Sequence, residues 1–295
     1  MTDSSAALIV GFTIQGLAIA RALSKAGITV YALEKSLRPK RVVDVNPLAY
    51  TNCANFFESD RLLGQELVDT LLACRSDIHE DQVVLFPTSD NTVKVLAEYW
   101  EQLSNEYLLS WSECRQEVWR IIQKGALPKY CEAARVSYPK TVMVSSGSDN
   151  DVAIEALTFP VLVKPNKPAS SFKTHICNSP NELVNFIQRQ KANWPLVVQE
   201  WVDGPDDNLY AYTCLVHDGV EVFGMSSRKV RASPPGLGRA TVIETFQDSN
   251  VRDESRKLIE VFGISGPIAT EFKRDNNGSY WFIEANVGRT EYCVD

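Results

Sequence analysis

The sequence predicts a mixed α/β and α+β protein that opens with a Rossmann-like unit and continues in strand-rich units. Residues 6–34 have the order strand, glycine turn, helix and strand that begins a doubly wound sheet. In the middle of the chain, a polar linker precedes an apolar strand that ends in lysine, and residues 268–292 have a hairpin pattern. At 295 residues and 44% hydrophobic, the chain is long enough for two or three domains.

The composition restricts the class of protein. No run of 18 apolar residues and no charged-then-apolar leader is present, so we expect a soluble protein that stays in the cytoplasm. The seven cysteines have neither CxxC nor CxxH spacing, which argues against a disulfide framework or a structural zinc site. The net charge of -7 gives no general attraction to nucleic acid or to an anionic membrane.

The N-terminal unit carries an incomplete dinucleotide motif. Gly11 and Gly16 bracket the first turn, and Thr13 stands where the motif G-x-G-x-x-G has its middle glycine. Glu34 occupies the place of an acid that would bind ribose. We favour a Rossmann-like fold that binds no dinucleotide over an NAD(P)-dependent dehydrogenase, because the three histidines lie in no motif that would serve hydride chemistry.

The strand at residues 82–86 of this unit is followed by polar residues. Thr88, Ser89 and Asp90 come directly after its carboxyl end. Residues at this position face the crevice where parallel sheets bind ligands, so they are candidates for substrate contact. They also suit the N-terminus of a helix at 91–103, and both interpretations can hold together.

A second unit begins after the polar linker at residues 145–151. The apolar strand in FPVLVKP ends in Lys164, which either extends to solvent or binds an anion, and we favour the anion. The loop after it contains Lys167 and Lys173. This loop either covers a polyphosphate or is a flexible surface loop.

Basic residues gather farther along the chain. Four cations lie within a dozen residues of one another, namely Arg228, Lys229, Arg231 and Arg239. In a chain of net charge -7 they form either an anion site or a solvated loop. A helix at residues 251–262 that ends at Gly263 then leads into the last hairpin.

The last hairpin carries a candidate metal site. Asn277 and Gly278 favour a two-residue turn, which places Glu271 directly opposite Glu284 and puts Asn286 on the same face. Facing like charges destabilise a strand pair, and a cation between them would remove the repulsion. Ligands that are all oxygen suit Mg²⁺ or Mn²⁺. An exposed hairpin with solvated glutamates, or a longer loop that shifts the pairing, remains the alternative.

The order of these parts resembles the ATP-grasp superfamily of ADP-forming carboxylate-amine ligases. The resemblance rests on VLVKP, on VVQEWVDG and on the closing pattern of a Glu, a hairpin and E-x-N. The stretch RKVRASPPGLG is similar to the basic loop of uncharacterised ATP-grasp carboligases. The resemblance implies a Rossmann-like pre-ATP-grasp domain at residues 1–115, then an ATP-grasp fold of two α+β subdomains at 116–205 and 206–295. Family members usually continue beyond the metal motif, so the second subdomain is expected to be truncated.

The resemblance also implies roles for individual residues. Lys124 and Lys164 match the two phosphate-binding lysines, and Lys173 would assist because the loop after Lys164 lacks the usual glycines. The hinge strand that reads adenine, largely through its backbone, contains Gln199, Glu200 and Val202, and Asp207 or Asp206 matches the ribose-binding acid. The implied metal ligands are Glu271, Glu284 and Asn286, and the candidates for the carboxylate and the transition-state charge are Arg228, Arg231, Arg239 and Arg289.

The implied activity is an ATP-dependent ligase that joins a carboxylate to an amine through an acyl phosphate. It would use ATP with Mg²⁺ or Mn²⁺, release ADP and phosphate, and take small molecules as substrates. The alternative is a non-catalytic ATP-binding sensor of the same fold, which the glycine-poor loop and the short C-terminal part favour. The oligomeric state is left open, with a homodimer as one option.

Overall fold

The structure is a computed structural model that describes residues 4–35, 51–145, 154–166, 172–205, 207–234 and 238–289. The chain divides into two compact units. The first unit consists of Met1–Trp119, Ser265–Pro267 and Val287–Asp295, and the second consists of Arg120–Ile264 and Ile268–Asn286. Residues 146–151 of the predicted linker, most of the loop with Lys167, and Asp206 lie outside the described residues, as does the Arg239 side chain.

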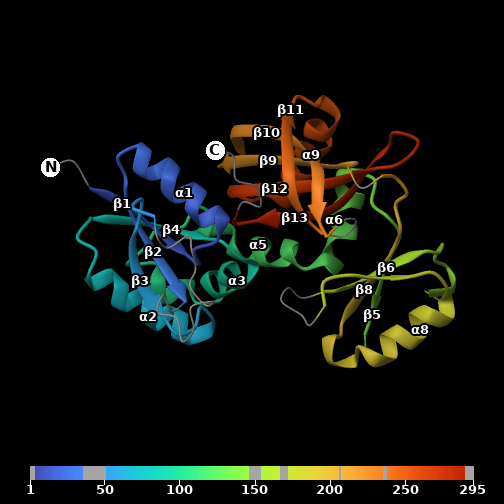
Figure 1. Cartoon of the computed structure of the whole chain (residues 1–295), viewed down its shortest axis with the longest axis horizontal. Helices are drawn as coiled ribbons and strands as arrows, with labels where there is room; N and C mark the ends of the chain where they lie inside the picture. Colours follow the sequence, from blue (N-terminus) through green and yellow to red (C-terminus); the bar gives the residue numbers. More distant parts are fainter. Residues whose placement is uncertain are drawn as a thin grey trace. The chain divides into compact units, whose positions relative to one another are not determined.

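The first unit contains the predicted doubly wound sheet. Its strands are β1 (Ser5–Val10), β2 (Thr29–Lys35), β3 (Asn55–Ser59) and β4 (Gln82–Pro87), all parallel in the order β3-β2-β1-β4. The strand order reverses between β1 and β4. Helices α1 (Ile14–Lys25) and α2 (Gly64–Ser76) lie on opposite faces of the sheet (Figure 1), as right-handed crossovers require. The Rossmann-like architecture predicted from the glycine turn is therefore confirmed.

The glycine turn after β1 is closed by side chains of the protein itself. The Phe12 N–H donates to Glu34 Oε2 at 2.5 Å, and Thr88 Oγ1 donates to the Gly11 carbonyl at 2.6 Å. Gly11 has a φ of 85°, and a Cβ there would lie 2.8 Å from Thr88 Oγ1. Glu34 and Thr88 are thus engaged by the turn, so neither is presented as a free ligand for a nucleotide.

The polar residues after β4 begin a helix. Ser89 is the N-cap of α3 (Asp90–Glu98) and forms a capping box with Thr92. The predicted single helix at 91–103 is wrong, because Tyr99 separates α3 from α4 (Trp100–Leu103). The next α-helix, α5, spans Arg115–Ile122. A short 3₁₀ helix η4 (Lys124–Ala126) and helix α6 (Leu127–Ala134) follow it.

The second unit contains a small antiparallel sheet in the order β5-β8-β6-β7. Its strands are β5 (Thr141–Val144), β6 (Val161–Pro165), β7 (His175–Cys177) and β8 (Leu196–Glu200). Helix α8 (Pro180–Arg189) covers one face (Figure 1), and its buried Leu183 and Phe186 pack in one cluster with strand residues that include Val163. The apolar run in VLVKP is therefore a core strand of this sheet.

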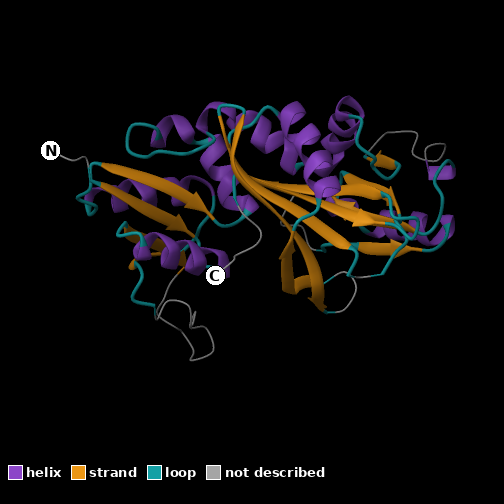
Figure 2. Ribbon diagram, turned by 90° about the horizontal axis from the view of Figure 1, so that it is seen from above, coloured by secondary structure: helices purple, strands orange, loops and turns teal. Residues whose placement is uncertain are grey.

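The second unit also contains a larger sheet in the order β11-β10-β9-β12-β13. Its strands, which lie side by side in Figure 2, are β9 (Leu209–His217), β10 (Val220–Ser233), β11 (Arg239–Phe246), β12 (Gly266–Arg274) and β13 (Tyr280–Val287). Helix α9 (Ser249–Phe262) packs beside α6 and ends at Gly263 with a φ of 60°, as predicted. Among the described residues, no helix combines the length and the apolar composition that crossing a membrane requires.

The loop of the last hairpin is longer than predicted. The Gly278 N–H donates to the Asp275 carbonyl at 3.1 Å, and the Asp275 N–H donates to the Ser279 carbonyl at 2.9 Å. Asp275 and Ser279 therefore close a three-residue loop, and the predicted two-residue turn is wrong. The Asp275 carboxylate accepts the N–H groups of Asn277 and Ser279, which favours this loop with glycine at its left-handed position.

The register of the hairpin changes along its length. The Gly288 N–H donates to the Pro267 carbonyl at 2.9 Å, which is the pairing that the two-residue turn predicts. The pairing at the loop differs from it by one residue, so the ladder contains an irregularity between its two ends. The direct facing of Glu271 and Glu284 consequently does not follow from the turn.

A hydrogen-bonded ionic network joins two strands of the larger sheet to helix α9. Glu221 on β10 accepts hydrogen bonds from Tyr212 Oη at 2.7 Å and from the Arg256 guanidinium at 2.7 and 3.0 Å. The Arg256 hydrogen bond is the main reason that the pKa of Glu221 lies below its ordinary value. Because Tyr212 lies on β9 and Arg256 on α9, this carboxylate fastens the helix to the sheet.

Replacing Glu221 should lower stability in a pH-dependent way. We expect Glu221→Gln to lower the free energy of unfolding by about 1 to 2 kcal/mol at pH 7. The carboxylate stabilises the fold fully above the pKa of an unfolded glutamate, about 4.3, and this contribution is lost as the pH falls through the lower pKa of the folded state. Urea unfolding between pH 7 and 3 measures it. Glu254→Gln, which removes an exposed pair with Lys257, is the control and should change stability by less than ~0.5 kcal/mol.

Candidate active site

Two lysines and two carboxylates of the second unit converge at one place. Lys164, at the end of β6, is only 6% exposed, and its Nζ donates to Gln199 Oε1 at 3.0 Å. Lys124, in η4, forms an ion pair with Glu284 on β13, with 2.8 Å between Nζ and Oε2. Beside them, the buried Asn286 donates from Nδ2 to Glu271 Oε1 at 2.9 Å.

The charges of this cluster act on one another. Burial lowers the pKa of Lys164 to about 8. The carboxylates of Glu284 and Glu271 oppose this shift, and the ammonium groups of Lys124 and Lys173 add to it. The pKa of Glu284 lies well below its ordinary value, mainly because of the charge of Lys124, with Lys164 and Lys173 contributing and burial opposing. The structure thus brings five of the predicted residues into one electrostatic site.

Two polar side chains of the hinge strand β8 form hydrogen bonds with other residues of the protein. Gln199 is 1% exposed, and besides accepting from Lys164 it donates to Thr141 Oγ1 at 3.1 Å. The Glu200 carboxylate accepts the Thr158 N–H at 2.8 Å. The side chains of Gln199 and Glu200 are thus engaged within the protein, and the contact of the hinge-strand backbone with adenine stays a prediction.

Two further predicted residues follow the hinge strand. Val202 lies just beyond the end of β8 and is half-buried. Asp207 is exposed in the connection to β9, and its suggested alternative Asp206 is not described.

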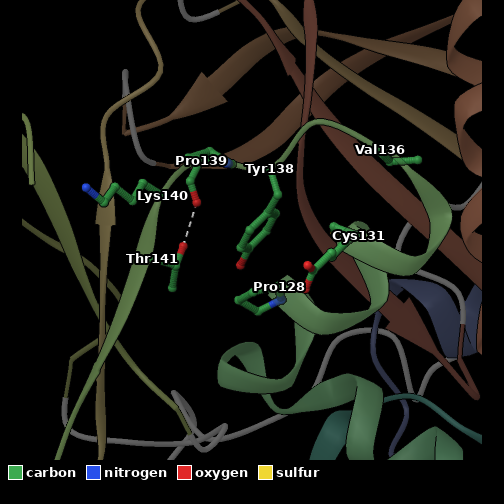
Figure 3. Close-up of a pocket in the computed structure, with 8 residues that line it drawn as sticks. Pro128, Cys131, Val136, Tyr138, Pro139, Lys140 and Thr141 are labelled. Carbon is green, nitrogen blue, oxygen red and sulfur yellow. Dashed lines mark hydrogen bonds between the residues drawn. The ribbon is translucent and has the colours of Figure 1, made fainter. Parts of the chain in front are cut away.

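A shallow hollow of about 240 Å³ is lined by residues of α6, of the segment that follows it and of the start of β5 (Figure 3). Tyr138 points toward Pro128 and Thr141, and Thr141 Oγ1 donates to the Pro139 carbonyl at 2.7 Å. Cys131 and Val136 contribute to its apolar wall. None of Lys124, Lys164, Glu271 or Glu284 lines the hollow, although its residue Thr141 accepts a hydrogen bond from Gln199, the partner of Lys164.

The predicted arginines have partners of different kinds. Arg228 pairs with Glu244 across β10 and β11, with Nε 2.9 Å from Oε1, and Arg231 is exposed beside an irregularity in the same strand pair. Arg289 belongs to the first unit, where its Nε lies 2.6 Å from Asp90 Oδ1 at the start of α3. Arg289 is therefore tied to the residues that follow β4, and its role toward an acyl phosphate stays a prediction.

Asn166 and Gly125 belong to the cluster although neither was predicted from the sequence. Asn166 is 7% exposed, and its Oδ1 accepts the Gly125 N–H at 2.7 Å. Strand alternation offered a signal, because Asn166 follows Lys164 by two residues and so projects from the same face. Gly125 offered a second signal, because it is a glycine directly next to a predicted phosphate-binding lysine.

Three possible metal ligands gather elsewhere in the second unit. Ligand atoms of His175, Cys177 and Glu182 lie within 4.8 Å of one another. Each is already engaged in packing: the His175 ring stacks on Phe186 at 3.9 Å, Glu182 accepts the Asn178 N–H at 2.9 Å, and Cys177 is fully buried in the core. Burial raises the pKa of Cys177 to about 11, which disfavours the thiolate that binds metal.

The titration of Lys164 provides a direct test of this cluster. We expect an NMR titration of protein labelled with ¹³C at lysine Cε to show one lysine with a pKa of about 8, against ~10.4 for an ordinary lysine. Lys164→Met should remove that signal. Glu284→Gln should lower its pKa further, because the negative charge of Glu284 raises it. Titration of every lysine above pH ~10 would contradict the assignment.

Some known proteins are similar to this chain in sequence. No family model matches the chain. Among curated proteins it is similar to the D-alanine–D-alanine ligases of Francisella philomiragia and Francisella tularensis subsp. novicida, at 25% and 26% identity over 163 residues. Each match covers 51% of this chain and 53% of the relative. The chain thus spans about half the length of the curated relatives that it matches.

Solved structures match nearly the whole chain. An N5-carboxyaminoimidazole synthetase from Staphylococcus aureus complexed with ADP has a TM-score of 0.72 at 15% identity, over 98% of this chain and 71% of that one. An L-amino acid ligase from Bacillus licheniformis has a TM-score of 0.70 at 15% identity, over 99% and 68%. A D-alanine–D-alanine ligase from Bacillus anthracis complexed with ATP has a TM-score of 0.60 at 14% identity, over 97% and 86%.

The structural matches establish the fold, and the sequence matches to the ligases agree with it. The predicted fold class, a Rossmann-like domain followed by an ATP-grasp fold, is confirmed. The chain therefore has the fold of these solved structures, and over about half of its length its sequence is similar to that of D-alanine–D-alanine ligases.

Proposed function

We propose that the protein is an ATP-dependent ligase that joins a small-molecule carboxylate to an amine and releases ADP and phosphate. The observation that carries the proposal is the ion pair of Lys124 with Glu284 beside the buried Lys164. It combines two candidate phosphate-binding cations with carboxylates that suit a divalent metal. The names of two similar proteins, D-alanine–D-alanine ligase and L-amino acid ligase, favour amino acids as the substrates.

The lysines would neutralise the phosphates of ATP. Phosphoryl transfer needs mainly positioning and charge neutralisation from a protein. Lys164 is suited to this because burial and its hydrogen bond to Gln199 fix the ammonium before a nucleotide arrives. Lys124 is suited because its partner is a carboxylate that it can exchange for a phosphate oxygen.

The donor set fits the metal that the superfamily implies. Glu271, Glu284 and Asn286 would hold Mg²⁺ or Mn²⁺, which supplies charge neutralisation and orientation of phosphate oxygens. Asn286 donates its amide N–H to Glu271, so two of the three proposed ligands lie side by side. Glu284 already binds one cation, the ammonium of Lys124, through Oε2.

The reaction would proceed in two displacements on the substrates. A carboxylate oxygen attacks the γ-phosphorus of ATP, the bond to the β-phosphate oxygen breaks, and ADP leaves. The amine then attacks the carbonyl of the acyl phosphate, phosphate leaves with the bonding electron pair, and the amine gives up a proton. The backbone of the hinge strand at Val202 would hold adenine, and Arg228, Arg231, Arg239 and Arg289 remain candidates for the carboxylate.

The main alternative is a non-catalytic ATP-binding sensor. The loop on which this alternative rested, at residues 167–171, lies outside the described residues. The similar proteins are ligases by name, and no described contact favours a sensor over a ligase. The proposal includes a cytoplasmic location, and it extends to a homodimer as one option for the assembly.

A pairwise screen of amino acids for ATP-dependent phosphate release tests the activity. Release of phosphate that requires both a carboxylate and an amine substrate supports the ligase. ATP binding without such release with any pair would instead support the sensor.

With an active pair, Glu284→Gln should lower ADP release by at least ~100-fold, because the variant loses a carboxylate that would hold the metal. Nucleotide binding should persist at lower affinity, as measured by calorimetry. Glu260→Gln, on the exposed face of α9, is the matched control and should keep full activity. Unchanged turnover by Glu284→Gln would refute the metal assignment.

Lys124→Met should change metal and nucleotide binding in opposite directions. Without nucleotide, Mn²⁺ should bind about 5-fold more tightly, since the variant no longer has an ammonium that competes for Glu284. ATP should bind more weakly, since a phosphate partner is lost. Paramagnetic resonance of Mn²⁺ and calorimetry with ATP measure the two effects. Lys129→Met, which removes an exposed lysine of α6, should change neither, and weaker Mn²⁺ binding by Lys124→Met would contradict the competition.

A further inference from the structure

We infer that Asn166 is a positioning residue that holds Lys124 in the phosphate site through the backbone of Gly125. The inference rests on the proposed function, in which Lys124 binds a phosphate of ATP. Asn166 would touch neither nucleotide nor metal. It would act on the lysine by fixing the peptide that follows it.

Asn166 is itself firmly held. It comes directly after β6, and its backbone N–H donates to the Pro195 carbonyl at 3.1 Å, just before β8. The residue is 7% exposed. A buried carboxamide requires hydrogen-bond partners, because leaving it unsatisfied is unfavourable. Its side chain therefore has a fixed place from which to act.

The side chain of Asn166 reaches the turn that carries Lys124. Its Oδ1 accepts the Gly125 N–H at 2.7 Å. This N–H belongs to the planar peptide unit that joins Lys124 to Gly125. Fixing that peptide plane restricts the direction in which the Lys124 side chain leaves the chain. From there the ammonium lies 2.8 Å from Glu284 Oε2.

The turn at Gly125 lies close to two side chains. A Cβ at this position would lie 2.2 Å from Met143 Sδ and 2.9 Å from Asn166 Oδ1. The turn therefore approaches both β5, through Met143, and the end of β6, through Asn166. A side chain at residue 125 would displace one or both of these side chains from the turn.

A carboxamide oxygen thus accepts a hydrogen bond at one lysine and directly beside the other. Gln199 Oε1 accepts from the ammonium of Lys164, and Asn166 Oδ1 accepts from the backbone next to Lys124. Lys164 and Asn166 are two residues apart at the end of β6. The end of this one strand consequently sets how the two ammonium groups are placed for neighbouring phosphates.

A double-mutant cycle tests the inference through ATP affinity. Binding of ATP in the presence of Mg²⁺ is measured by calorimetry for the wild type, Asn166→Ala, Lys124→Met and the double variant. We expect Asn166→Ala to weaken ATP binding by about 10-fold, since the Gly125 N–H loses its partner. In the Lys124→Met background the same substitution should change the affinity by less than about 2-fold, because the lysine that it positions is absent.

Control variants separate positioning from general stability. Asn193→Ala removes a 2.7 Å hydrogen bond to Gln190 that lies near β8 and has no link to Lys124, and it should leave ATP affinity unchanged. Asn166→Ser keeps a polar group that is too short to reach Gly125, and it should behave like Asn166→Ala in the cycle. Thermal unfolding of every variant monitors the fold.

The outcomes separate this inference from the proposed function. A wild type that binds no ATP overturns the proposed function and the inference with it. A wild type that binds ATP, together with equal losses from Asn166→Ala in both backgrounds, overturns the inference alone. Unchanged affinity of Asn166→Ala, or failure of both Asn166 variants to fold, also overturns it, since Asn166 would then be idle or purely structural.

Discussion

The ion pair between Lys124 and Glu284 is the interaction on which the charged cluster of the second unit depends. It connects the turn before α6 to β13 of the larger sheet. Partly buried carboxylates and ammonium groups are unfavourable unless they compensate one another. Glu284 is kept ionised by Lys124 first and by Lys164 and Lys173 after it. In the proposed function, phosphate oxygens and a metal ion would replace the partners that the protein supplies to itself.

Burial of Lys164 adds a second constraint. Desolvation disfavours its charge, and the carboxylates of Glu284 and Glu271 restore part of it. A polar chain runs from Thr141 through Gln199 to Lys164, so the amide of the hinge strand is committed to holding the lysine. Because a buried polar group without a partner is unfavourable, this chain also fixes β5, β6 and β8 relative to one another.

In the first unit, too, polar groups are hydrogen-bonded to partners within the protein. Glu34 accepts the Phe12 N–H, and Thr88 donates to the Gly11 carbonyl, so the turn of a dinucleotide motif is filled by the protein. Arg289 pairs with Asp90 at the start of α3. Because side chains of the protein already bond to this glycine turn, the turn is compatible with the prediction that the unit binds no dinucleotide.

The sequence alone determined the Rossmann-like opening, the core strand that ends in Lys164 and the membership of Glu271, Glu284 and Asn286 in one hairpin. These features follow from local periodicity and turn residues, which act over short separations. It did not determine the turn length, because the Asp275 side chain stabilises a three-residue loop that competes with the two-residue turn. Only the tertiary structure decided that Gln199 holds Lys164, that Arg289 pairs with Asp90 and that Asn166 supports Lys124 through Gly125. Each of these depends on packing between segments that are 35 or more residues apart, which no local pattern encodes.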